Sequence, residues 1–399
     1  MKPVDRSSPS LRVAVGLVLA LIVYGSLYPF HWNFAAPQPF LWSSRIGLMD
    51  LLENIALFVP LGGLLGWAGQ GRQRRWVFFA AWWVLALAVA SALQWLQKYL
   101  PRTPALSDIV FNSTGLVLGW GMGALARWRV GHLLVRHQGW EDVDRFTLVL
   151  VALWGVAELY PLIPTLDVSS VARNVQSLWR QDGWQPRRML LHTGMAVIGL
   201  AAVAQMVRGA DLAHRARAAA LLATGTVLVG KFVVAGQSPG LPVVLGIAGG
   251  WALWRGLDQW AQGWQGWAVA GVALATYLLD ALWPWGWRSP PVDMQWVPFA
   301  SSLSTWVQGA VSARAFECLC LGAMLWGTVR QGALLGGMTV CTAVLALACE
   351  GVQRYLPTRT PEVTAAVLAL GMGWLLSACH PTRPRAAAEP ARRRSLRGV

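Results

Sequence analysis

The sequence predicts an all-α protein, a polytopic integral membrane bundle of about 12 transmembrane helices. Of its 399 residues, 55% are hydrophobic and only 13% are charged, whereas a soluble domain carries roughly 25% charged residues. The charges sit in short clusters between apolar runs long enough to cross a hydrocarbon core of ~30 Å. The predicted spans are residues 12–29, 50–68, 76–96, 105–126, 146–164, 189–207, 217–235, 241–256, 266–283, 313–328, 332–351 and 361–378.

Two of these spans, 217–235 and 241–256, are short or rich in Gly and Pro, which leaves eleven as the alternative count. The first apolar run is not followed by a small-x-small cleavage site, so we interpret it as an uncleaved span. No stretch of the sequence is polar and long enough to predict a separate soluble domain.

The basic residues predict the orientation of the chain. When Lys and Arg are divided between alternate loops, 21 of the 33 fall on the side of the N-terminus. Cytoplasmic loops carry the excess of Lys and Arg, so we expect both termini, including the basic tail 379–399, to be cytoplasmic. The basic residues flank the spans and form no patch interleaved with aromatic residues, so the net charge of +15 does not indicate nucleic-acid binding.

Two landmarks recur along the chain and predict internal repeats. The prolines at the ends of the first, fifth and ninth spans are 132 and 123 residues apart, and Gly-Trp pairs in the fourth, eighth and twelfth spans are 131 and 123 residues apart. The segment 97–104 also matches 353–361 with one insertion. These spacings predict three parallel four-helix repeats over residues 12–126, 146–256 and 266–378, joined by polar connectors at 127–145 and 255–265.

Polar side chains inside membrane spans are costly and are functional candidates by default. Asp108 and Asn112 are four residues apart and share a helix face. With the N-terminus inside, the candidates lie at the outer face or in the outer leaflet. The structural alternative makes Asp108 a helix cap and Asn112 an interhelical hydrogen-bonding residue beside the ridge Gly115-x3-Gly119-x3-Gly123. The candidate residues are Asp50, Asn54, Gln94, Gln97, Arg102, Asp108 and Asn112 in the first repeat and Glu350, Gln353 and Arg359 in the third.

Other ionisable residues carry weaker predictions. We interpret His192 as a satisfied core histidine, Glu158 and Asp280 as charges near the outer ends of their spans, and Lys231 as the main candidate near the bilayer midplane. The five cysteines lie in or beside apolar stretches without metal-ligand spacing, so they are interpreted as small hydrophobic residues. We therefore expect neither a metal nor another cofactor.

The first repeat resembles a known family. Asp50-x3-Asn54-x3-Phe58-x-Pro60-x-Gly62, a Gln at the end of the next helix, then Arg102 and Asp108-x3-Asn112-x2-Gly115 resemble the VanZ-like family, named for a teicoplanin-resistance protein. The resemblance is good over 12–126 and weak over 266–378. Family members have Glu three residues before the Gln of the third helix. The first repeat has Gln94 in place of this Glu, whereas the third repeat has Glu350. One motif is therefore split between the two copies.

The resemblance implies a cell-envelope protein of the bacterial inner membrane, linked to envelope biogenesis or glycopeptide antibiotic resistance. We expect binding rather than catalysis, with a membrane lipid, a lipid-linked glycan or a lipoglycopeptide held in an outer-leaflet polar pocket between the first and third repeats. The alternatives are a repeat-built transporter and a membrane enzyme that acts on a lipid-linked substrate with Asp108 or Glu350 as the base. The oligomeric state does not follow from the sequence.

Overall fold

The computed structural model describes residues 9–27, 32–41, 48–69, 74–100, 104–136, 144–162, 168–179, 185–210, 212–234, 237, 239–259, 262–304 and 307–379. Within these ranges the secondary structure is helical apart from two isolated β-bridges. The predicted tail 379–399 lies outside them after Cys379.

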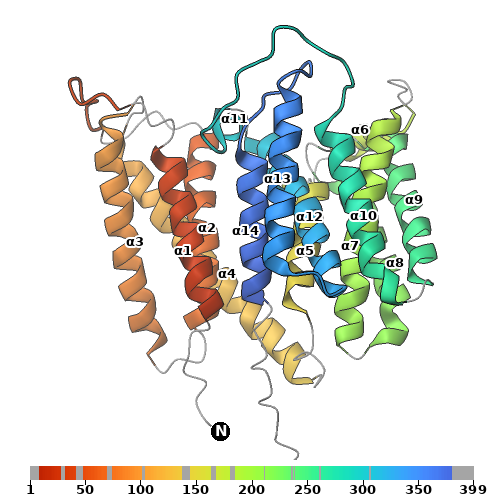
Figure 1. Ribbon diagram of the computed structural model, residues 1–399. Helices are drawn as coiled ribbons and strands as arrows, with labels where there is room; N and C mark the ends of the chain where they lie inside the picture. The colour runs from red at the N-terminus through yellow and green to blue at the C-terminus, as the bar shows by residue number, and fades with distance from the viewer. Residues whose placement is uncertain are drawn as a thin grey trace, which may run out of the picture. The chain divides into compact units, whose positions relative to one another are not determined.

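Each predicted span overlaps one long α-helix (Figure 1). These helices are α1 (Pro9–Leu27), α2 (Leu48–Gly69), α3 (Arg75–Gln97), α4 (Leu106–Arg136), α5 (Arg145–Leu159), α7 (Pro186–Gly209), α8 (Ala216–Val233), α9 (Leu241–Asp258), α10 (Gln262–Ala281), α12 (Val307–Arg330), α13 (Leu335–Gln353) and α14 (Thr364–Cys379). The shorter α6 (Val168–Gln176), α11 (Ala300–Ser304) and the 3₁₀ turn η2 (Ala213–Arg215) lie between them.

Six helical segments of the described chain are long and apolar enough to cross a membrane, which makes this a multi-pass membrane protein. They are Arg75–Gln97, Leu106–Arg127, Pro186–Gly209, Ala213–Val233, Ala310–Arg330 and Leu335–Gln353. The count of twelve spans stays a prediction. Parts of the predicted polar connectors are helical: α4 continues to Arg136, and only residues 259–261 separate α9 from α10. A polar helical turn continues a helix as readily as an apolar one once the turn before it is formed.

The chain divides into two compact units, residues 1–140 and 141–399. In the first unit, α2 and α4 pack main chain against main chain. Gly62 and Gly66 of α2 and Gly115, Gly119 and Gly123 of α4 lie so close to the opposite helix that an added Cβ would overlap its main-chain atoms. The predicted glycine ridge is therefore confirmed as a close helix contact.

The second unit is built around α7 and α12. In each of these helices 56% of the residues in the apolar span are buried. The cause is the number of neighbouring helices. α7 packs against α5, α8, α9, α10 and α12, and α12 also packs against α5, α10, α11, α13 and α14. One continuous hydrophobic core runs through this unit, including Phe146 of α5, Ile198 of α7 and Leu319 of α12.

The four helices of each predicted repeat make corresponding contacts. The second helix packs on the fourth in all three quartets, as α2 on α4, α7 on α9 and α12 on α14. The Gly-Trp landmark corresponds only in part, because Gly119 and Gly250 face the second helix of their quartet whereas Gly373 faces Thr339 of the third. Counted from the preceding Pro361, Gly373 comes three residues earlier than Gly119 does from Pro104. Three residues turn a helix about 60° short of a full turn, which explains the different neighbour.

Candidate functional site

A short parallel bridge fixes the start of α4 in the first unit. The Leu41 N–H donates to the Pro104 carbonyl at 3.0 Å, and the Leu106 N–H donates to the Leu41 carbonyl at 3.1 Å. The Gln94 side chain, on the last turn of α3, completes this connection because its Oε1 accepts from the Ala105 N–H at 3.1 Å. The N-terminus of α4 is thus attached both to the end of α3 and to the segment before α2.

Gln94 also joins the first turn of α4 through a side-chain hydrogen bond. Its Nε2 donates to Asp108 Oδ2 at 3.2 Å, and only 3% of Gln94 is exposed. Asp108 is partly exposed and is the third residue of α4, in the first helical turn. A carboxylate in a first helical turn is stabilised by the helix dipole, so Asp108 presents a localised negative charge at the end of the span.

Asn112, one turn further along α4, is a buried acceptor without a partner. Only 6% of this residue is exposed, and its Oδ1 has no hydrogen bond from any described residue. Such a group costs about 1–3 kcal/mol when it is left unpaired. Asn112 lines a small space between α2, α3 and α4 together with Phe58, Trp83 and Leu116. This space has no volume for a water molecule, so the oxygen is enclosed by the packing of the three helices.

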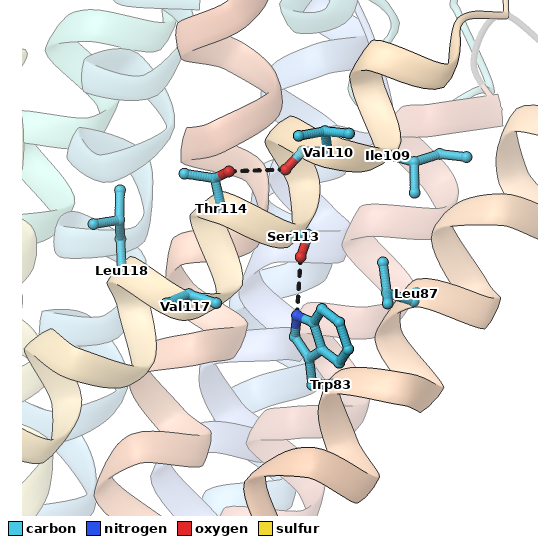
Figure 2. Close-up of a pocket in the computed structure, with 8 residues that line it drawn as sticks. All are labelled: Trp83, Leu87, Ile109, Val110, Ser113, Thr114, Val117 and Leu118. Carbon is cyan, nitrogen blue, oxygen red and sulfur yellow. Dashed lines mark hydrogen bonds between the residues drawn. The ribbon is translucent and has the colours of Figure 1, made fainter.

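An open groove lies between α3 and α4, and the first residue of α4 that lines it is Ile109, which follows Asp108 in the sequence (Figure 2). It has a volume of about 410 Å³. Its hydroxyl groups are engaged within the protein: Ser113 Oγ accepts from Trp83 Nε1 at 2.9 Å, and Thr114 Oγ1 donates to the Val110 carbonyl at 2.9 Å. The groove is lined by Trp83 and Leu87 of α3 and by Ile109, Val110, Ser113, Thr114, Val117 and Leu118 of α4.

The other candidates of the first repeat are less closely joined to this site. Gln97 is buried and its Nε2 donates to the Ser26 carbonyl near the end of α1 at 2.9 Å. Asn54 is half-buried on α2. The main chain of Asp50 belongs to α2, but its side chain lies outside the described residues, as does all of Arg102.

The third repeat builds the same helix-end connection with different side chains. The Gln295 N–H donates to the Pro361 carbonyl at 3.0 Å, and the Val363 N–H donates to the Gln295 carbonyl at 3.1 Å. Glu350 Oε2 accepts from the Glu362 N–H at 3.0 Å, as Gln94 accepts from Ala105. Glu350 therefore has the position of Gln94 and the same role at the start of the last helix.

The carboxylates of the third repeat are compensated within the protein. Arg314 Nη1 lies 3.3 Å from Glu362 Oε1 and 2.8 Å from Glu317 Oε2. Glu362 Oε2 accepts from the Ser301 N–H at 3.1 Å, and Gln353 is buried nearby on the last turn of α13. Removal of these charges from water is offset by their mutual contacts, so this cluster has the character of a helix connection.

Arg359 binds the main chain of its own unit. Its Nε donates to the Trp283 carbonyl at 2.9 Å, and its Nη2 donates to the Asp280 carbonyl at the end of α10. The Asp280 carboxylate also lies 2.5 Å from Arg187 of α7, which joins the second quartet to the third. A cation at a helix C-terminus stabilises the unsatisfied carbonyls there.

Sequence reasoning missed one cluster that the structure brings together, Glu158, His192 and Lys231. The Glu158 side chain is fully buried, and its Oε2 lies 3.0 Å from Lys231 Nζ and 2.9 Å from His192 Nδ1. Lys231 also donates to the Glu158 carbonyl at 2.5 Å. His192 is indeed a hydrogen-bonded core residue, as the sequence predicted.

The repeat register contained the signal for this cluster. Glu158 lies three residues before Pro161, as Ser26 lies three residues before Pro29. The carbonyls of Ser26 and Glu158 accept from the last turns of α3 and α8 respectively, from Gln97 and Lys231. The prediction that Lys231 lies near the bilayer midplane was wrong, because it sits in the last turn of α8 and is held at the end of α5.

Comparison with known proteins identifies one segment. Residues 7–127 match the VanZ/LLP1 family model. The predicted resemblance is therefore confirmed over this segment, which contains Gln94, Asp108 and Asn112. No curated protein and no solved structure matches the chain.

Proposed function

Because residues 7–127 of this multi-pass membrane protein are VanZ-like, we propose that the chain is a non-enzymatic cell-envelope protein that binds an amphipathic ligand. The ligand class is a lipid-linked glycan or a lipoglycopeptide, with a role in envelope biogenesis or glycopeptide resistance. One observation carries the proposal: the partly exposed Asp108 carboxylate is held by Gln94 in the first turn of a membrane-length helix of the VanZ-like segment. A hydroxyl or amide N–H in the polar part of the ligand donates to the Asp108 carboxylate.

We also propose that the protein lies in the inner membrane with three four-helix repeats and with both termini in the cytoplasm. The corresponding hydrogen bonds of Gln94 and Glu350, and of the Leu41 and Gln295 bridges, support common descent of the first and third quartets. The excess of Lys and Arg on the side of the termini supports the orientation. A pocket shared by the first and third repeats stays a prediction.

Asp108→Asn tests the binding site. The substitution preserves the size of the side chain and its acceptor for Gln94 while it removes the charge. We expect protein abundance in the membrane within about twofold of wild type, and loss of roughly 10–100-fold in ligand affinity, the effect of a charge-assisted hydrogen bond worth about 1.5–3 kcal/mol. The measurement is growth of a deletion strain, complemented with each variant, against a lipoglycopeptide, together with a profile of envelope lipids and polysaccharides.

Asp293→Asn is the matched control, because it removes an exposed carboxylate from the other unit. The control should complement like wild type. If Asp108→Asn complements fully at normal abundance, Asp108 does not bind a ligand. If the deletion changes neither growth nor the envelope profile, the proposed function is wrong.

Cysteine labelling tests the orientation. A membrane-impermeant thiol reagent applied to intact cells should modify Thr103→Cys and spare Gln73→Cys, because the predicted orientation places the loop after α3 outside and the loop before it inside. The unsubstituted chain, which has five free cysteines, supplies the background. Labelling of Gln73→Cys alone would reverse the orientation.

A further inference from the structure

The α3–α4 groove continues from the polar site along one helix face. Gln94 lies on the same side of α3 as Ala90, Leu87 and Trp83, at intervals of four, three and four residues. Trp83 and Leu87 line the groove, and Ala90 lines the small space that contains Asn112. The polar pair Gln94–Asp108 therefore marks one end of an apolar path that runs toward the middle of both helices.

The groove lies at the depth of hydrocarbon. Both of its helices contain segments long and apolar enough to span a membrane. On α4 its lining runs from Ile109 to Leu118, roughly 14 Å at 1.5 Å per residue. Val110, Val117 and Leu118 are exposed along it. An occupant of this groove therefore lies along the parts of α3 and α4 that are apolar enough to span a membrane.

The shape and chemistry of the groove select the occupant. Because Ser113 and Thr114 are already hydrogen-bonded, the wall offers apolar surface only. A single alkyl chain is thin enough to lie in the volume of about 410 Å³.

Asn112 lies behind the groove and does not line it. The small space that it lines shares Trp83, Leu87 and Ser113 with the groove but has no volume for a water molecule. The polar group that a ligand can reach is the partly exposed Asp108. An amphiphile with a polar donor at one end of an alkyl chain matches this order of carboxylate and apolar surface.

We propose that the α3–α4 groove is a binding site for one alkyl chain of a membrane amphiphile, whose polar part lies at Asp108. This inference rests on the proposed function and narrows the ligand to a molecule with an alkyl chain, which excludes a water-soluble glycan. The alkyl chain sets the depth of the ligand in the membrane, and the polar residues of the protein select the polar part of the ligand.

The test is photo-crosslinking of the full-length protein in phospholipid vesicles that contain a lipid with a diazirine on its acyl chain. Crosslinked residues are mapped by mass spectrometry. We expect labelling at Val117 and Leu118 about tenfold above that at Leu222, an exposed residue of α8 in the other unit. Val117→Trp, which fills the groove, should reduce groove labelling about tenfold, because several methylenes lose their contacts.

Met122→Trp is the matched control, since Met122 is exposed on the same helix outside the groove. It should leave labelling at Leu118 unchanged. Equal labelling of the groove and Leu222, or no effect of Val117→Trp, overturns the inference. Efficient disulfide dimers of Val117→Cys without lipid labelling overturn it in favour of a second copy of the chain.

The two proposals fail separately. If groove labelling disappears with Val117→Trp while Asp108→Asn has no effect on complementation, the alkyl site is supported and the polar site is wrong. If labelling in the groove equals labelling at Leu222 while Asp108→Asn abolishes complementation, the protein holds only the polar part of the ligand.

Discussion

Lys231→Met is expected to destabilise the unit 141–399 by about 3–5 kcal/mol, the cost of leaving one member of a buried ion pair without its partner. The Glu158 side chain is fully buried, and Lys231 Nζ lies 3.0 Å from its carboxylate. Lys231 also donates to the Glu158 carbonyl and to Gln237 Oε1. Without the ammonium group, Glu158 keeps only His192 as a side-chain partner among the contacts described here. Thermal unfolding in mild detergent, followed by fluorescence-detected size exclusion, measures the change.

Arg217→Met is the control for this prediction, because Arg217 is an exposed cation on the same helix. It should change stability by less than about 0.5 kcal/mol. The double variant Glu158→Gln with Lys231→Met should recover part of the loss, because no uncompensated charge then remains buried. If Lys231→Met unfolds at the temperature of Arg217→Met, the cluster does not hold α5 to α8.

Gly119→Leu is expected to destabilise the unit 1–140 by about 3 kcal/mol, the upper part of the range for overpacked contacts. A Cβ at Gly119 would overlap the Val59 carbonyl oxygen and lie 2.9 Å from the Gly63 nitrogen. These are main-chain atoms of α2, so no side-chain rotation relieves the overlap and the helices must separate. Abundance in the membrane should fall severalfold, since losses of this size lower the steady-state level of marginally stable proteins.

Gly121→Leu is the matched control on the same helix. An added Cβ at Gly121 has no neighbour within 4 Å, and Leu favours a helix by almost 1 kcal/mol over Gly. This variant should be as abundant as wild type or slightly more so. Equal abundance of the two leucine variants would contradict the close packing of α2 on α4.

The two units differ in their ion pairs and in their accessible apolar surface. In the unit 141–399, the described contacts bring Glu158 to Lys231, Asp280 to Arg187 and Glu362 to Arg314. In the VanZ-like segment, the Gln94–Asp108 pair lies on the two helices that line an open apolar groove. Buried polar atoms without a hydrogen bond occur in both units, so the groove and the partly exposed Asp108 are what distinguish the VanZ-like segment. We therefore expect binding to depend on the VanZ-like segment and folding to depend on both units.

The sequence by itself determined the helical class, the approximate position of every long helix and the glycine ridge of α4. Hydrophobic runs of fixed length and i, i+4 spacing are local properties, so they can be recognised without knowledge of the neighbours. The motif from Asp50 to Gly115 also identified the VanZ-like segment, later matched over 7–127. Helix ends were less exact, as the extension of α4 to Arg136 shows.

Only the tertiary structure decided which polar residues meet. Lys231 and Glu158 are 73 residues apart and Arg359 and Asp280 are 79 apart. Helical periodicity shows on which face of its helix a side chain lies, but it does not identify the neighbouring helix that this face contacts. For the same reason, the sequence could not distinguish Asn112, whose oxygen is unpaired, from Gln94, whose amide is satisfied at both ends. That difference depends on side-chain positions set by the packing of α3 and α4, and hydrogen bonds are lost within a few tenths of an ångström beyond their normal length.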